Sequence, residues 1–203
     1  MQPIVLQPSR LPHLIRSLCL LIALSGVTLF LACHEPIVIP DMPTAQEQYA
    51  IALQQYQDFC NPIMAHRKEQ RDEIASRALA AFTNVITRFP AEKQEVAWSE
   101  YRIADIHKRL GKSKQSLEEF DLLSMKYPDN EDVAVSALME AGDLSDDLGK
   151  HEKAKVYYNE AIKQFGASKK ESTQKIIQYC ATRYRKVWGK KITPVATPRK
   201  DVK

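Results

Sequence analysis

The sequence repeats itself at a spacing of 38 residues, and this period limits the folds open to the chain more than any other feature does. Each period contains a small residue, then an aromatic residue, then a proline or a glycine. The aligned positions are Ala78, Ser116 and Ala154, then Phe82, Phe120 and Tyr158, then Pro90, Pro128 and Gly166. A period of this length indicates that one supersecondary unit is stacked several times along the chain.

Each period is typical of two helices joined by a tight turn. Gly111 and Gly149 lie between a leucine and a lysine, where glycine can adopt the left-handed conformation that ends a helix. Pro90 and Pro128 end the second helix because proline cannot continue it. The small residue lets the neighbouring helix approach, and the aromatic ring fills the space beside it. We predict an all-α fold with helices over 44–59, 66–88, 93–110, 114–126, 131–148, 152–165 and 170–188.

These landmarks resemble those of the tetratricopeptide repeat. The family pattern of small, aromatic and helix-ending residues falls on Ala104, Ser116, Phe120 and Pro128, and again on Gly142, Ala154, Tyr158 and Ala161. Leu123 and Gly166 depart from the pattern, and the period is longer than the common one of about 34 residues. The resemblance implies an α-solenoid, a tetratricopeptide-like helical-hairpin array of about three repeats over 44–188 with a C-terminal capping helix.

The N-terminal residues indicate export. Residues 17–32 carry no charge, and the only charged side chains before them are Arg10 and Arg16. This is the layout of a signal peptide, and the stretch is shorter than the roughly 20 apolar residues that span a bilayer. Ala32 and Cys33 resemble the lipobox of bacterial lipoproteins, which implies cleavage and acylation at Cys33. The alternative is an uncleaved signal anchor in which Cys33 is an ordinary thiol.

The chain is therefore divided into four parts. We expect residues 1–32 to be a lipoprotein signal peptide and residues 33–43, which contain three prolines, to be an extended tether. Residues 44–188 form the helical array. Residues 189–203 are expected to be a basic, disordered tail.

Charge is distributed unevenly along the chain. Residues 33–168 contain 16 basic and 23 acidic side chains, whereas residues 169–203 contain 11 basic and two acidic ones. We expect one face of the last helix to be a solvated cap, because terminal repeats need a polar outer face. Its basic residues are Lys175, Arg183, Arg185 and Lys186. Contact with anionic lipid headgroups or with an acidic protein surface is the alternative; nucleic acid is not expected, because export removes the protein from it.

The sequence contains no recognisable catalytic constellation. The motifs of serine hydrolases, zinc proteases and nucleotide-binding loops are absent. His107 lies at an inward position of a helix, where we expect it to be packed. Cys60 and Cys180 lack the spacing of a metal or redox pair, so we expect two separate thiols, with a disulfide as the alternative. No enzyme activity, metal or cofactor is predicted.

The resemblance implies that the first helices of successive pairs line a concave groove for a protein partner. The groove positions carried over from the family are Trp98, Tyr101, Asp105, Lys108 and Arg109, then Ser136, Met139, Asp143, Asp146 and Asp147. Asp143 and Asp146 stand where chaperone-binding relatives use lysine and asparagine to hold a C-terminal carboxylate, so that ligand is not expected. A groove with aromatic and methionine side chains at its floor and acidic side chains along its walls would fit a partner segment that has apolar anchor residues and basic flanking residues. Packing between repeats is the alternative for Trp98 and Tyr101.

Export combined with such an array is similar to lipoproteins of the BamD family, which scaffold the β-barrel insertion machinery. The resemblance implies a lipid-anchored scaffold in the bacterial cell envelope, at the outer membrane and facing the periplasm. Its partners would be envelope assembly factors or outer-membrane proteins. That family usually has more repeats than this chain. Two alternatives remain, a subunit that works with the periplasmic solute-binding protein of a transporter and a surface-exposed lipoprotein adhesin.

Overall fold

Helices make up most of the residues that the computed structural model describes, which are residues 37–63 and 68–188. The helices there are α2 (Ala45–Cys60), α3 (Lys68–Arg88), α4 (Lys93–Arg109), α5 (Ser113–Lys126), α6 (Glu131–Asp147), α7 (His151–Phe165) and α8 (Glu171–Trp188). Each end lies within two residues of the predicted one, so the predicted all-α fold is confirmed. The predicted signal peptide, Cys33 and the predicted tail lie outside the described residues.

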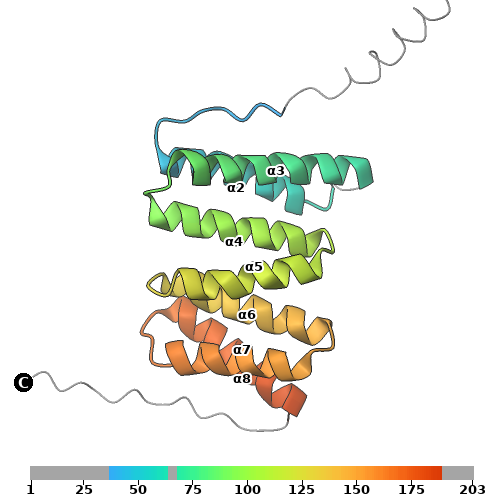
Figure 1. The fold of residues 1–203 in the computed structure, drawn as a ribbon, viewed down its shortest axis with the longest axis vertical. Helices are drawn as coiled ribbons and strands as arrows, with labels where there is room; N and C mark the ends of the chain where they lie inside the picture. Colours follow the sequence, from blue (N-terminus) through green and yellow to red (C-terminus); the bar gives the residue numbers. More distant parts are fainter. Residues whose placement is uncertain (1–36, 64–67, 189–203) are drawn as a thin grey trace, which may run out of the picture. The chain divides into compact units, whose positions relative to one another are not determined.

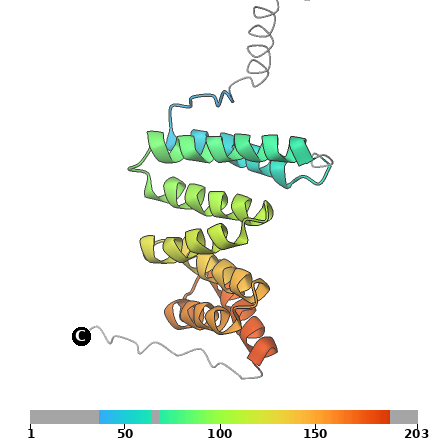
Figure 2. The same ribbon diagram turned by 45° about the vertical axis from the view of Figure 1, so that its right-hand side comes forward.

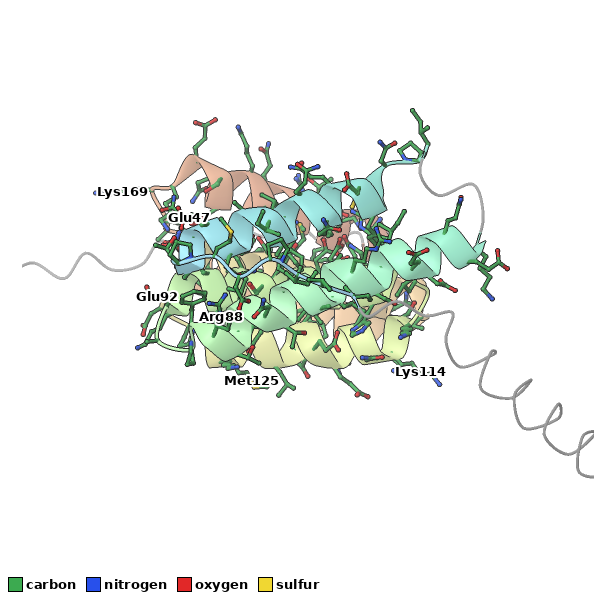
Figure 3. All side chains as sticks on the ribbon, turned by 90° about the horizontal axis from the view of Figure 1, so that it is seen from above. Glu47, Arg88, Glu92, Lys114, Met125 and Lys169 are labelled. Atoms are coloured by element: carbon green, nitrogen blue, oxygen red, sulfur yellow. The ribbon has the colours of Figure 1, made fainter. Side chains whose placement is uncertain are left out.

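The helices stack as successive pairs within the unit that begins at Ile39 (Figures 1 and 2). Helix α2 packs on α3, α4 on α5, and α6 on α7, while α8 covers the last pair. The first helices also contact one another, α2 with α4, α4 with α6 and α6 with α8, whereas no such contact joins α3, α5 and α7 within the described ranges. We call α2, α4, α6 and α8 the inner layer, and α3, α5 and α7 the outer layer. In Figure 3, α2 and α8 lie towards one side of this unit and α3 and α5 towards the other.

Glycine ends the first helix in the second and third pairs, as predicted. Backbone φ is +78° at Gly111 and +71° at Gly149, in the left-handed region that disfavours other residues. The N–H of Lys112 then donates to the carbonyl of His107 at 3.0 Å, which satisfies a carbonyl at the helix end. After Gly149, the N–H of Lys150 likewise donates to the carbonyl of Ser145 at 2.7 Å. These two turns fix where the chain reverses into the outer layer.

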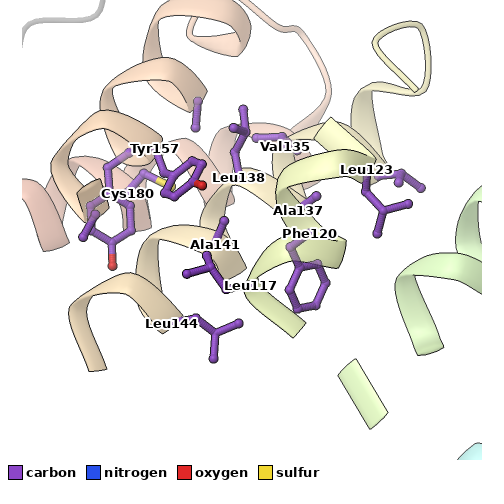
Figure 4. Packing of buried hydrophobic residues seen from close by; sticks show 14 of the residues in the cluster. Leu117, Phe120, Leu123, Val135, Ala137, Leu138, Ala141, Leu144, Tyr157 and Cys180 are labelled. Carbon is purple, nitrogen blue, oxygen red and sulfur yellow. The ribbon is translucent and has the colours of Figure 1, made fainter. Parts of the chain in front are cut away.

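Aromatic rings of the outer layer fill the space between the helices. The aromatic landmarks of the repeat, Phe82, Phe120 and Tyr158, are fully buried. Figure 4 shows Phe120 and Leu117 of α5 near Ala137 and Ala141 of α6 within this core. Burial of such apolar surface is the main favourable contribution to folding. The residues that define the period are therefore the residues that hold the pairs together.

Gly142 marks a very close approach between α6 and α7. A Cβ atom at this position would lie 2.5 Å from Cε1 and 2.8 Å from Cδ1 of Tyr158. The buried ring cannot move away easily, because its hydroxyl donates to Oδ1 of Asp143 at 2.5 Å. The ring crosses the α6 backbone at residue 142 to reach this carboxylate. This explains why glycine stands where the preceding pair has Ala104.

A buried glutamine fixes residues 39–42 to the first pair of helices. Gln48 of α2 is fully buried, and its Nε2 donates to the carbonyl of Pro40 at 3.1 Å. Its Oε1 accepts from the backbone N–H of Met42 and from Nη1 of Arg88, each at 2.9 Å. The last part of the predicted tether is therefore attached to the folded unit and is not a free spacer.

Replacing Gly142 by alanine should destabilise the protein, although alanine in a helix is favoured over glycine by about 1 kcal/mol. The added methyl group overlaps the ring of Tyr158, and overpacking of this kind costs about 1–3 kcal/mol. We expect the free energy of unfolding in urea, followed by circular dichroism, to fall by about 1 kcal/mol, which is the overpacking cost less the gain in helix propensity.

The control places the same alanine in a Tyr158→Leu background, where the ring is gone. There the Gly142→Ala change should be neutral or stabilising. An equal loss in both backgrounds would contradict the close contact.

Candidate functional site

The groove residues predicted from the sequence lie on α4 and α6 of the inner layer and differ in exposure. Three of them are buried, namely Tyr101, Asp105 and Ser136. Five are half-buried, namely Trp98, Lys108, Met139, Asp143 and Asp146. Arg109 and Asp147 are exposed. The inner layer therefore combines residues that pack the array with residues that reach its surface.

Tyr101 packs between two other rings. Its ring centroid lies 5.3 Å from that of Trp98 and 5.2 Å from that of Phe120, in edge-on arrangements that aromatic pairs favour. Met139 also packs partly against the core around Tyr101. The structure thus places Tyr101 in packing between helices, and Trp98 is the more accessible ring of the two.

Asp105 is the centre of a charged cluster that joins three inner helices. Tyr56 of α2 donates its hydroxyl hydrogen bond to Asp105. Lys108 Nζ lies 2.8 Å from Asp105 Oδ1 and 2.7 Å from Oε2 of Glu140 on α6, and Arg109 Nε donates to Asp105 Oδ2 at 2.6 Å. We call these five residues the Asp105 cluster. It connects α2, α4 and α6.

The Asp105 cluster favours the ionised carboxylate. Burial alone would raise the pKa of Asp105, but hydrogen bonds from Lys108, Tyr56 and Arg109 outweigh burial and hold that pKa below its ordinary value. The hydrogen bond to Asp105 likewise raises the pKa of Arg109. Ionisation of Asp105 therefore contributes to the stability of the folded protein.

Arg183 of α8 forms a second charged cluster with α6. Its Nη2 lies 3.0 Å from Oδ2 of Asp146, and its Nε lies 3.4 Å from Oδ1 of Asp143. Tyr179 donates to Oδ2 of Asp143 at 2.8 Å, and Tyr158 donates to Oδ1. The prediction of a solvated basic face on the last helix is therefore wrong for Arg183. The reason is that α8 packs with this face towards the acidic residues of α6.

Arg102 of α4 is surrounded by aromatic rings. Its guanidinium carbon lies 4.9 Å from the ring centroid of Tyr56, 5.6 Å from that of Tyr101 and 5.7 Å from that of Trp98. Burial lowers the pKa of Arg102, but hydrogen bonding to Tyr49 outweighs it and raises that pKa. Within the described ranges no carboxylate pairs with Arg102, and its buried Nε has no hydrogen-bond partner. A half-buried cation of this kind can receive an anionic group from outside.

A pocket of about 730 Å³ opens where α3 turns into α4 and α5 turns into α6. Trp98 and Tyr127 contribute rings to it, Pro90 and Pro128 come from the two turns, and Lys170 precedes α8. We call it the turn pocket. Its volume lies within the range of about 300–1,000 Å³ that is usual for ligand pockets.

The rim of the turn pocket carries charges of both signs. Lys126 pairs with Glu100 at 2.6 Å, and Lys170 pairs with Asp132 at 3.1 Å. Asp129 also lines the pocket and forms no ion pair with the part of the chain that the structure describes. The pocket therefore presents a free carboxylate next to aromatic and proline side chains.

Sequence reasoning found Trp98 but missed the other residues of the turn pocket. The sequence pattern indicates only that Pro90 and Pro128 end helices, whereas in the structure both also line the pocket. The 38-residue period contained the signal, because two turns one period apart lie at the same end of a stacked array. The aromatic rings around Arg102 could not be predicted in this way, because one of them, Tyr56, comes from the preceding pair of helices.

The histidine and cysteine residues that could serve catalysis, metal binding or a disulfide do not form such a site among the described residues. His107 is buried as predicted, and its Nδ1 lies 2.8 Å from Oε2 of Glu119. Cys60 and Cys180 are free thiols, and burial raises the pKa of Cys180 to about 12. Within residues 37–63 and 68–188, no group of histidine, cysteine or acidic side chains has the arrangement of a metal site. None of the helices there has both the length and the apolar character of a membrane span.

Replacing Asp105 by asparagine should destabilise the protein by about 2 kcal/mol at neutral pH, because Lys108 and Arg109 lose their shared carboxylate. Asp105 has a lowered pKa in the folded state, so its contribution is present above the unfolded value of about 3.9. It is lost as the pH falls through the folded-state pKa. The difference in free energy of unfolding between wild type and variant should therefore shrink below about pH 4.

Glu118→Gln serves as the control for this measurement, because Glu118 is exposed on the outer layer. It should leave stability unchanged within about 0.5 kcal/mol. If Asp105→Asn behaves like this control, the Asp105 cluster does not stabilise the array.

The sequence profile of the tetratricopeptide repeat matches residues 135–164, which cover most of α6 and α7. Neither a curated protein nor a solved structure matches the chain. The matched segment includes the contact between Gly142 and Tyr158. Stacked repeats of this kind present extended surfaces that bind other proteins, and they are typically not enzymes. The chain is an all-α array of helical pairs that contains a tetratricopeptide repeat.

Proposed function

We propose that this protein is a membrane-anchored scaffold that binds a protein partner along the inner layer of its array. The observation that carries this proposal is Arg102, a half-buried cation stacked on aromatic rings with no carboxylate partner among the described residues. Trp98 lies beside it and reaches the surface. Tryptophan and arginine are enriched among the residues that contribute most to protein–protein affinity.

The charged clusters narrow the chemistry of the partner. Asp105 is already paired with Lys108 and Arg109, and Asp143 and Asp146 are paired with Arg183. Basic flanks on the partner would therefore have to displace existing ion pairs. A segment with an apolar anchor for Trp98 and an acidic group for Arg102 fits the inner layer better.

The proposed location is the bacterial cell envelope, with the protein lipid-anchored through Cys33 at the outer membrane and facing the periplasm. The uncharged stretch 17–32 followed by Ala32 and Cys33 supports this location. More than one acyl chain is needed for stable anchoring, as in bacterial lipoproteins. The proposed partners are envelope assembly factors or outer-membrane proteins.

A photoreactive amino acid in place of Trp98 should crosslink the partner in living cells. Trp98 reaches the surface beside Arg102, whereas Tyr101 is buried and is a poor position for a probe. We expect mass spectrometry of the crosslinked product to identify an envelope assembly factor or an outer-membrane protein. Adding Arg102→Ala should reduce the yield at least about fivefold, since an interface arginine commonly contributes more than 1 kcal/mol.

The matched control places the same probe at Met125, which is exposed on α5 of the outer layer and projects outward from the helices in Figure 3. Equal crosslinking from Met125 and from the Trp98 position would contradict binding along the inner layer. Recovery of a solute-binding protein would favour the transporter-linked subunit. If a host surface protein is the sole crosslinked product, the result would favour the adhesin.

Replacing Cys33 by serine should abolish labelling of the protein by an alkyne analogue of palmitate, because acylation requires the thiol. It should also release the protein from the membrane fraction or leave an uncleaved precursor. Cys60→Ser, a change within α2, should remain labelled. A Cys33→Ser protein that is still membrane-bound and has its normal size would favour the uncleaved signal anchor.

A further inference from the structure

The turn pocket favours a segment that combines rigid apolar residues with basic ones. Its lining includes four carboxylates, and two of its three lysines are already paired with two of them. Among the described residues, Asp129 and Glu131 are left without an ion pair, against one unpaired lysine, Lys93, so the lining keeps an excess of negative charge. The rings of Trp98 and Tyr127 add flat apolar surfaces. Aromatic-lined grooves bind proline-containing segments because such segments are extended before they bind.

The chain itself contains a segment with this chemistry. Residues 189–203 include five basic side chains, one acidic side chain and two prolines, Pro194 and Pro198. Arg199 and Lys200 directly follow the second proline. The composition of the segment, basic residues beside prolines, therefore complements the carboxylates and rings of the pocket.

The segment is long enough to return to the pocket. Helix α8 begins next to Lys170, which lines the pocket, and Figure 3 places Lys169 at the same end as Glu92 and opposite Lys114. The 18 residues of α8 extend about 27 Å from that end. The 15 residues that follow Trp188 can span up to about 50 Å. The second half of the segment, which includes Pro198, can therefore reach the pocket.

We propose that residues 189–203 dock in the turn pocket of their own molecule, with Pro198 against the rings and Arg199 and Lys200 facing the carboxylates around Asp129. Because the segment is covalently attached, its effective concentration at the pocket is on the order of millimolar, so modest contacts are sufficient. Trp98 belongs to the pocket and also lies beside Arg102. The docked segment and a protein partner therefore compete for Trp98.

Quenching of Trp98 fluorescence by acrylamide in the full-length protein tests this docking. The chain has two tryptophans, so Trp188→Phe leaves Trp98 as the only one, and excitation selective for tryptophan then reports on Trp98 alone. The double substitution Arg199→Glu and Lys200→Glu reverses the charge of the part that enters the pocket. We expect it to raise the quenching constant about twofold, because the tail no longer covers the ring. High salt should raise quenching in the parent protein in the same way.

The matched control is Lys190→Glu with Lys191→Glu, which makes the same change of charge close to the end of α8. It should leave quenching unchanged. Equal quenching constants in the parent and both variants would overturn the proposal. Protection of Trp98 that increases with protein concentration would also overturn it, because the segment would then come from a second copy. The measurement needs no partner, so its failure would leave the proposed scaffold function untouched.

Discussion

In the α6–α7 pair an aromatic ring lies directly against the backbone of the facing helix. Tyr158 occupies the space that a side chain at residue 142 would need. In the preceding pair, the hydroxyl of Ser116 donates to the carbonyl of Ala104 at 2.7 Å, which also holds the two helices close together. These contacts set the distance between the two helices of a pair. They thereby bring successive inner helices within reach of one another, on which the charged clusters and the surroundings of Arg102 depend.

The charged clusters of the inner layer link particular helices to one another. A buried ion pair offsets much of its own attraction by the loss of hydration, whereas removal of one partner leaves a costly unpaired charge. Asp105 is satisfied only when α2, α4 and α6 are all in place, and Arg183 only when α8 lies on α6. Each cluster therefore favours the native order of helices over other ways of stacking the same apolar faces.

Local chemistry made much of the fold predictable. The period, the glycines at 111 and 149 and the prolines gave the helices to within two residues, because each signal acts within one or two turns of its own position. The candidate site was less predictable. Arg183, Arg102 and Gln48 take their roles from partners in other helices or in the N-terminal segment. The repeat period does not indicate which side chains of other helices will contact these three residues.

Under the proposed acylation of Cys33, the attachment of residues 39–42 by Gln48 would limit how far the array can move from the lipid. Only five residues separate Cys33 from Ile39, which corresponds to a reach of at most about 20 Å. An array anchored by such a short segment would sample only a thin layer above the headgroups, so its encounters with partners would approach those of diffusion in two dimensions. Under that constraint the height at which a partner displays its binding segment above the bilayer selects among partners, independently of affinity.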